Sequence, residues 1–120
     1  MNRPMKVAVL SAKTSDKYFN LLDKKLNELI ETSQCYLFYI LCGNLEDGKP
    51  IPRTLGEIWA LKNGAPILYI SEKTTEALLR KTFLVADYVI FLIDGNPIIN
   101  KALMQYKMMG KHGSIIKVNE

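Results

Sequence analysis

The sequence predicts a single doubly wound α/β domain, residues 1–120, with a five-stranded, mainly parallel sheet in the order βαβαβαβαβ. The length of 120 residues supports one hydrophobic core, because two cores would each be too small to bury enough surface. Short, dense apolar runs alternate with longer amphipathic segments. Amphipathic segments of this length can act as the crossover helices that parallel strands require, and such helices cover both faces of the sheet.

The first half of the chain begins this alternation. Residues 6–10 form a short apolar run, which predicts the first strand, and residues 16–30 place apolar side chains three or four positions apart, which predicts a helix. Residues 35–42 form a dense apolar run with aromatic side chains and the β-branched Ile40, which predicts a strand buried on both faces that ends at Gly43. Residues 44–53 combine Gly and Pro with charged side chains, so we expect a loop there.

The second half repeats the pattern, and local capping signals mark several boundaries. Asn96 and Pro97 are typical of an N-cap and a first helical position. The expected elements are a helix at 54–63 ended by Gly64, a strand at 65–70, a helix at 73–86 after an ordinary start at 71–73, a strand at 87–93, a helix from Asn96 to Gly110, and a strand at 114–118.

Composition and charge narrow the classes of function. The 48% apolar content excludes a disordered chain, and the formal charge of +4 is spread along the sequence. A spread positive charge favours attraction of small anions over a nucleic-acid groove, so we expect no nucleic acid polymer as partner. The apolar runs, such as residues 88–93, are far shorter than the roughly 20 residues of a membrane span, and the N-terminus lacks the features of a secretion signal. We therefore expect no membrane partner and a cytoplasmic location.

The cysteines, the single histidine and two aromatic residues receive structural interpretations. Cys35 and Cys42 are seven residues apart and have no second pair, which fits neither a zinc site nor a disulfide framework, so we expect reduced, buried thiols and no metal or cofactor. His112 has no acidic or cysteine neighbour in the sequence and is expected to be exposed rather than catalytic. Trp59 and Tyr69 are expected in the core rather than as stacking platforms.

In doubly wound sheets, ligands bind beyond the carboxyl ends of the strands, where the strand order reverses. The loop after the first strand contains Ser11, Ala12, Lys13 and Thr14, small and hydroxylated residues with one cation that lead into a helix. Backbone N–H groups at a helix N-terminus together with a lysine favour an anion. The structural alternative is that Ser15 or Asp16 only caps the helix and that Lys13 is solvated.

The second candidate stretch follows the second strand and contains Gly43 and Asn44, and then Arg53, Thr54, Gly56 and Glu57. Thr54 and Glu57 have the spacing of a capping box, which would account for both residues structurally. The two glycines and Arg53 instead suit close approach to a phosphate or sugar. Glu57 would then accept hydrogen bonds from ribose, or stabilise an oxocarbenium ion in an enzyme.

The third candidate stretch follows the fourth strand and contains Asp94, Gly95 and Asn96. A carboxylate and an amide at the end of a strand suit recognition of sugar hydroxyls. Asp-Gly is also a common turn, and Asn before Pro is a common helix cap, so both interpretations stay open.

These stretches resemble motifs of the SLOG superfamily, a Rossmann-like group that includes LOG-type phosphoribohydrolases, DprA-like proteins and small nucleotide-ligand sensor domains. The resemblance covers nearly the whole chain and implies a nucleotide site at the loops named above. Residues 6–14 are similar to a divergent first-strand motif of the family. Cys42-Gly43 is similar to the opening of the family's phosphate loop, and Thr54-Leu55-Gly56-Glu57 is similar to the Thr-x-x-Glu that closes this loop. In the later half of the chain, the resemblance rests on residues 86–88, Asp94-Gly95 and Gly110-Lys111.

The chain departs from the enzymes of that group at two places. Ser11 and Lys13 stand where the first motif normally has Gly and Arg, and the glycine cluster of the phosphate loop is reduced to Gly43 followed by an insertion. A hydrolase needs that compact loop to hold the 5′-phosphate, whereas a binder accepts any loop that fits its ligand. The leading hypothesis is therefore a non-catalytic binder of a nucleotide or nucleotide-derived signal, such as a cyclic nucleotide or an ADP-ribose-type messenger.

We expect such a stand-alone domain to act by sequestering its ligand, for instance as a phage-encoded or accessory anti-defence protein. The first alternative is an N-glycosidic phosphoribohydrolase acting on nucleoside 5′-monophosphates, with Glu57 at the sugar and Arg53 or Lys13 at the phosphate. The second is an interaction protein with a vestigial pocket. A homodimer or higher homo-oligomer is expected in each case, because Ile58, Trp59 and Leu61 place apolar side chains on more than one face of a short helix.

Overall fold

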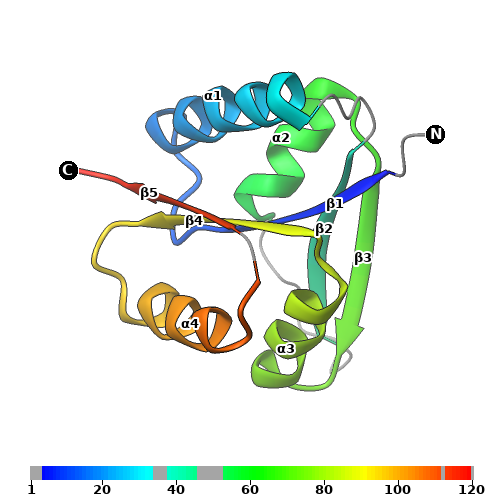
Figure 1. Ribbon diagram of the computed structural model, residues 1–120, viewed down its shortest axis with the longest axis vertical. Helices are drawn as coiled ribbons and strands as arrows, with labels where there is room; N and C mark the ends of the chain where they lie inside the picture. Colours follow the sequence, from blue (N-terminus) through cyan, green and yellow to red (C-terminus); the bar gives the residue numbers. More distant parts are fainter. Residues whose placement is uncertain (1–3, 34–37, 46–52, 112, 120) are drawn as a thin grey trace.

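The computed structural model describes residues 4–33, 38–45, 53–111 and 113–119. Strands and helices alternate along the chain, as the sequence predicts (Figure 1). The elements are β1 (Met5–Leu10), α1 (Asp16–Ser33), β2 (Phe38–Leu45), α2 (Leu55–Asn63), β3 (Ile67–Glu72), α3 (Thr75–Val85), β4 (Tyr88–Ile93), α4 (Pro97–Met108) and β5 (Gly113–Lys117).

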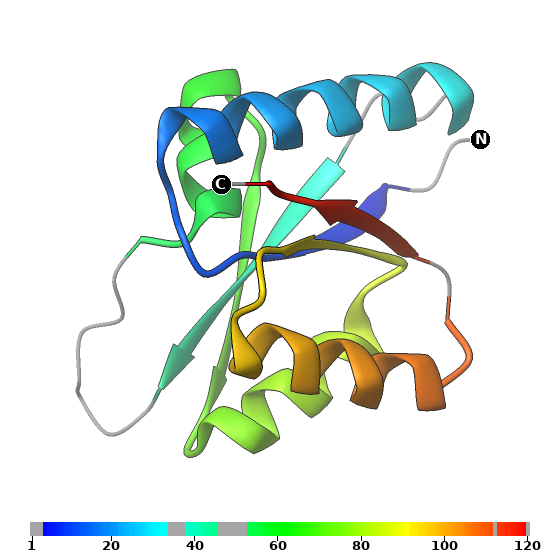
Figure 2. The ribbon, with the colours of Figure 1, turned by 90° about the vertical axis from the view of Figure 1, so that its left-hand side faces the viewer.

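The strands form one five-stranded sheet in the order β3-β2-β1-β4-β5, and every neighbouring pair is parallel. Helices α1 and α2 cover one face of the sheet, and α3 and α4 cover the other (Figures 1 and 2). This arrangement confirms the predicted doubly wound α/β fold, and the sheet is wholly parallel rather than mainly parallel. The strand order reverses at β1, since the chain adds β2 and β3 on one side of it and β4 and β5 on the other.

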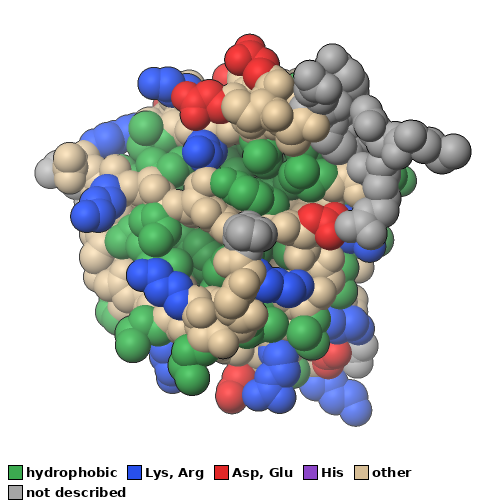
Figure 3. Space-filling view, viewed as in Figure 1, with side chains coloured by type: hydrophobic (Ala, Val, Ile, Leu, Met, Phe, Trp, Pro, Cys, Tyr) green, Lys and Arg blue, Asp and Glu red, His purple; other side chains and the backbone are tan. Residues whose placement is uncertain are grey.

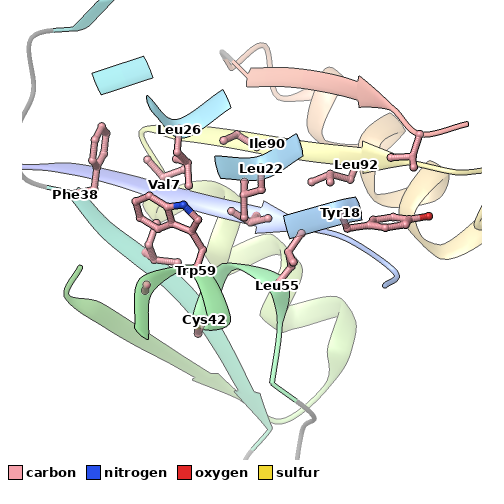
Figure 4. Close-up of a cluster of buried hydrophobic side chains, with 14 residues drawn as sticks. Val7, Tyr18, Leu22, Leu26, Phe38, Cys42, Leu55, Trp59, Ile90 and Leu92 are labelled. Carbon is pink, nitrogen blue, oxygen red and sulfur yellow. The ribbon is translucent and has the colours of Figure 1, made fainter. Parts of the chain in front are cut away.

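Each face of the sheet has its own hydrophobic cluster. Under α1 and α2, the helix residues Leu22, Leu26 and Trp59 pack on alternate residues of the central strands (Figure 4). Under α3 and α4, Phe83, Phe91 and Tyr106 form a set of tilted aromatic contacts with ring centroids 5.0–6.1 Å apart. Strands β1, β2 and β4 are buried on both faces because helices cover both, which explains their continuous apolar runs.

The predicted boundaries of α2 and the predicted start of α4 are confirmed by their caps, whereas α4 ends at Met108 rather than at Gly110. The Thr54 side chain accepts a hydrogen bond from the Glu57 backbone N–H, and Gly64 ends α2 in the left-handed conformation with φ 67°. The Asn96 side chain caps α4, and Pro97 occupies its first turn.

Two boundaries differ from the prediction because of pairing between β2 and β3. Strand β2 does not end at Gly43: Gly43 pairs with Ile70, and Asn44 pairs with Ser71. Ser71 and Glu72 consequently belong to β3 and are not a helix start. Helix α3 begins at Thr75, and Thr74 caps it by accepting a hydrogen bond from the Ala77 N–H at 3.1 Å. The sequence predicts the start at 71–73 because the pairing of β3 with β2, which extends the strand through Glu72, is a contact between distant segments.

The two aromatic predictions have different outcomes. Trp59 is 3% exposed, and its indole N–H donates to the Asp23 carboxylate at 2.9 Å, so its placement in the core is confirmed. The placement of Tyr69 was wrong, because β3 is an edge strand and Tyr69 is 56% exposed there. Burial of Trp59 also removes it from the surface expected to drive association, where Leu61 stays exposed.

Cys42 is a buried free thiol, as predicted, whereas Cys35 and His112 lie outside the described residues. Within the described ranges, the structure has no helix with both the length and the apolar character needed to cross a bilayer.

Candidate functional site

The loops after β1 and β4 leave the carboxyl edge of the sheet side by side, at the point where the strand order reverses (Figures 1 and 2). Leu10 and Phe91 are register partners in the β1–β4 pair. Lys13 lies three residues after Leu10, and Asp94 lies three residues after Phe91. The two residues therefore follow adjacent strands at the same distance from a shared register position. The sequence-predicted residues of these two loops are therefore brought together.

Asp94 is held by donors from two elements. The phenol of Tyr18, on α1, donates to Asp94 Oδ2 at 2.7 Å, and the backbone N–H of Asn96 donates to Oδ1 at 3.0 Å. These hydrogen bonds, with the positive charge of Lys13 as a further contribution, lower the pKa of the Asp94 carboxyl below its ordinary value. Asp94 is therefore a fixed, partly exposed anion at physiological pH.

The loop after β1 is shaped by Ser11. The Ser11 hydroxyl donates to the Lys13 carbonyl oxygen at 2.7 Å and faces the Lys13 backbone N–H at 3.4 Å. Ala12 and Thr14 are exposed beside it. These contacts fix the backbone of Lys13, whose charge is among those that act on Asp94.

Gly95 and Asn96 have the structural roles that their sequence allowed. Gly95 has φ 93°, a conformation that favours glycine, and forms the turn between β4 and α4. The Asn96 side-chain oxygen accepts from the backbone N–H groups of Ile98 at 2.9 Å and Ile99 at 3.3 Å. Because this oxygen already satisfies the first N–H groups of α4, Asn96 acts as a helix cap rather than as a group held ready for ligand.

A pocket of about 140 Å³ lies at the carboxyl ends of β1 and β2. It includes Gly43 and Thr54 from the predicted site, and Leu10 links it directly to Ser11 and the loop that carries Lys13. Its walls are mostly apolar. The lining residues are Ala8, Val9, Leu10, Leu41, Cys42, Gly43, Thr54, Leu78, Leu79 and Thr82.

The two glycines of the predicted phosphate loop allow close packing. A Cβ atom on Gly43 would lie 2.6 Å from a methyl carbon of Leu78, because α3 packs directly against β2 at this point. A Cβ atom on Gly56 would lie 3.1 Å from Ile40 and 3.2 Å from Val9, since the first turn of α2 rests on β1 and β2. Packing thus accounts for both glycines. The Asn44 backbone is paired within the sheet, and its side chain lies outside the described residues.

Glu57 and Arg53 form a second polar group beside the pocket. Arg53 Nε lies 3.7 Å from Glu57 Oε1, and the Tyr69 phenol lies close enough to the same carboxylate to be influenced by its charge. Desolvation, and next the Glu57 charge, raise the pKa of the Tyr69 phenol. The Glu57 side chain is therefore paired with Arg53, and its backbone N–H donates to the Thr54 hydroxyl oxygen, which is one half of the predicted capping box.

The predicted residues thus form two groups along one sheet edge, with Lys13 and Asp94 at β1 and β4, and Thr54 with Glu57 at β2 and α2. Sequence reasoning missed Tyr18, which fixes Asp94 from 76 positions away, and the α3 side of the pocket. The spacing of Tyr18 showed only a buried helix position. No signal in the sequence identified its hydroxyl as a site group.

The thiol of Cys42 provides a chemical probe of the pocket. Burial raises its pKa to about 11, and this effect exceeds the opposing hydrogen bond with Thr54, whose hydroxyl oxygen lies 3.8 Å from the sulfur. Thiolate is the reactive form, so the fraction available at pH 8 is roughly two-hundredfold below that of an ordinary cysteine with a pKa of about 8.5.

We expect iodoacetamide to modify Cys42 at pH 8 at least about 100 times more slowly in the folded protein than in the denatured chain. The measurement uses a Cys35→Ser variant and mass spectrometry, and the folded rate is expected to rise with pH up to about 11. Equal rates in folded and denatured protein would contradict a buried, protonated thiol.

Among the described residues, no group of three or more His, Cys, Asp or Glu side chains is placed to hold a metal ion. A scan against models of known protein families and a search of curated proteins found no match for this sequence.

Proposed function

We propose that this chain binds a nucleotide or a nucleotide-derived signalling molecule at the carboxyl edge of its sheet, without turning it over. The observation that carries the proposal is the meeting of three features at that edge: the reversal of strand order, the small apolar pocket, and the Lys13–Asp94 pair on adjacent loops. Ligands of doubly wound sheets bind at this place. The resemblance to SLOG proteins supports the same location.

The size and lining of the pocket indicate which part of the ligand it takes. Small-molecule sites commonly have volumes of roughly 300–1,000 Å³. The pocket of about 140 Å³ suits one flat, apolar part such as a nucleobase. The remaining polar part would then extend along the edge toward Ser11 and Lys13, where the ammonium group attracts phosphate.

The charge distribution supports a small anion rather than a polymer. On the face shown in Figure 3, Lys and Arg side chains are separated by hydrophobic and uncharged groups rather than gathered in one stripe. A nucleic-acid groove generally presents a continuous basic surface. A single lysine beside a pocket is sufficient for a small phosphorylated ligand.

The contacts of Glu57 favour binding over hydrolysis. Its carboxylate forms an ion pair with Arg53, with 3.7 Å between Arg53 Nε and Glu57 Oε1, and lies near the Tyr69 phenol. In a phosphoribohydrolase, Glu57 would have to leave Arg53 to act at the glycosidic bond. We therefore propose sequestration or sensing of the ligand as the role of the site, in a protein that associates as a homo-oligomer.

Isothermal titration against AMP, GMP, ADP-ribose and cyclic mono- and dinucleotides tests this function. At least one is expected to bind with a Kd below about 100 μM, equivalent to roughly 5.5 kcal/mol, and chromatography of the mixture is expected to show no free base. Lys13→Ala should weaken that binding about tenfold or more. Lys24→Ala, which removes an exposed lysine from α1, should leave it within twofold.

Three results would contradict the proposal. Absence of binding across the whole panel would contradict nucleotide binding. Release of free base by the unmodified protein but not by Glu57→Gln would show that the protein is an enzyme instead. Equal losses in the Lys13 and Lys24 variants would show that the attraction is a general effect of net charge.

A further inference from the structure

Asp94 is positioned far more firmly than an ordinary carboxylate in a surface turn. Tyr18 is 1% exposed in the core under α1, and its ring lies at one end of that cluster with the hydroxyl pointing outward (Figure 4). That hydroxyl holds Asp94 Oδ2 at 2.7 Å, while the Asn96 N–H holds Oδ1. A buried aromatic ring therefore fixes where the Asp94 carboxylate lies.

The fixed carboxylate still has capacity for further donors. An ionised carboxylate has about four acceptor positions and no donor, and the two described hydrogen bonds occupy one position on each oxygen. The neighbouring Gly95 borders open space, since a Cβ atom placed there would meet nothing within 4 Å. Groups of a ligand can therefore approach Asp94 from the side of Gly95.

The charges of Lys13 and Asp94 select opposite parts of a nucleotide. A carboxylate repels phosphate and accepts hydrogen bonds from hydroxyls, whereas the ammonium of Lys13 attracts phosphate. Since both residues follow adjacent strands at the same distance from a shared register position, one bound nucleotide could contact both of them. Ribose hydroxyls are the donors that a nucleotide of this kind can offer to Asp94.

We propose that Asp94 is a specificity-determining residue that accepts hydrogen bonds from a free 2′,3′-diol of the ligand's ribose. This inference rests on the proposed nucleotide-binding function and narrows it. The ligand is a ribonucleotide or ADP-ribose-type molecule with unblocked ribose hydroxyls, rather than a deoxynucleotide or a molecule cyclised through those hydroxyls. Tyr18 acts as the positioning residue that holds Asp94 for this contact.

Titration of the unmodified protein tests the proposal without any variant. AMP, GMP and ADP-ribose are compared first, and the tighter-binding monophosphate is then compared with its 2′-deoxy and 2′,3′-dideoxy analogues. The dideoxy analogue is expected to bind at least about tenfold more weakly, because it leaves the carboxylate without its hydroxyl donors. Equal affinity for the two would overturn the assignment of Asp94 while leaving nucleotide binding intact.

Asp94→Asn and Tyr18→Phe give the residue-level test. Asp94→Asn should weaken binding of the ribonucleotide about tenfold and leave the dideoxy analogue within twofold, which abolishes the discrimination. Tyr18→Phe should reduce discrimination partly, because the carboxylate is kept but loses its fixed position. Full discrimination in a folded Asp94→Asn protein, judged by circular dichroism, would overturn the inference, and failure of every nucleotide to bind would overturn the proposed function with it.

Discussion

Replacing Gly113 with alanine is expected to lower the free energy of unfolding by about 3 kcal/mol, because the added Cβ atom meets a rigid backbone. Gly113 is the register partner of Val89, and an ideal Cβ at position 113 lies 2.6 Å from the Val89 carbonyl oxygen and 3.1 Å from the Tyr106 ring. Val89 is fully buried in the sheet, so its carbonyl cannot move aside without disturbing β4. Relief would require β5 to separate from β4.

Urea denaturation followed by circular dichroism measures this effect. Ile115→Ala, on the same strand but 46% exposed, is the matched control and should cost less than about 1 kcal/mol. Equal and small losses in the two variants would contradict the close approach of β5 to β4 at Gly113.

Replacing Lys111 with methionine is expected to lower the free energy of unfolding by about 2 kcal/mol, because its ammonium group donates hydrogen bonds to backbone carbonyl oxygens at the end of α3. Lys111 Nζ donates to the carbonyl oxygens of Phe83 at 2.6 Å, Leu84 at 3.0 Å and Ala86 at 3.3 Å. Helix α3 has no basic residue in its own last turn, so the complementary charge comes from the segment before β5. Methionine keeps most of the apolar stem and removes the charge and the donors.

Lys107→Met on α4 is the matched control, since it removes an exposed lysine close to Lys111 in the sequence. Thermal denaturation should show a clear decrease in Tm for Lys111→Met and a much smaller decrease for Lys107→Met, whose exposed charge lies in the last turn of α4. The account of the α3 terminus would be wrong if both variants had the stability of the unmodified protein.

The fold was predictable because its signals are local and repeat along the chain. Dense apolar runs marked strands that are buried on both faces, and Thr54, Gly64 and Asn96 marked helix ends that the structure confirms. The Gly110-Lys111 pair was noted only as part of a resemblance. The structure supplies a physical reason for the lysine, which holds the carbonyl groups at the end of α3.

The errors arose where the outcome depends on the order of strands in space. Tyr69 lies in an apolar run, but β3 is an edge strand, and the sequence contains no local signal for an edge. Gly43 reads as the end of a strand, yet pairing with Ile70 continues β2 beyond it. A side chain at position 43 would collide with Leu78 of α3, so the glycine is explained by a contact between segments that are distant in the sequence.

The candidate site was predictable as a set of loops but not as a set of contacts. Parallel strands place their carboxyl ends at one edge, so the loops that carry Lys13 and Asp94 could be expected to meet. The hydrogen bond from Tyr18 to Asp94 joins α1 to the end of β4 and depends on how the helix packs. The division into a group around Asp94 and another around Glu57 likewise required the structure.

Nitrogen-15 NMR titration with AMP and ADP-ribose tests the central claim most directly, because it reports which backbone amides respond to ligand. The account predicts saturable shifts that gather at residues 9–14, Cys42 and Gly43, Thr54 and 93–96, on the carboxyl edge of the sheet. Shifts confined to the opposite edge, near Phe38, Asn63 and Ala65, or no shift at millimolar nucleotide, would contradict it.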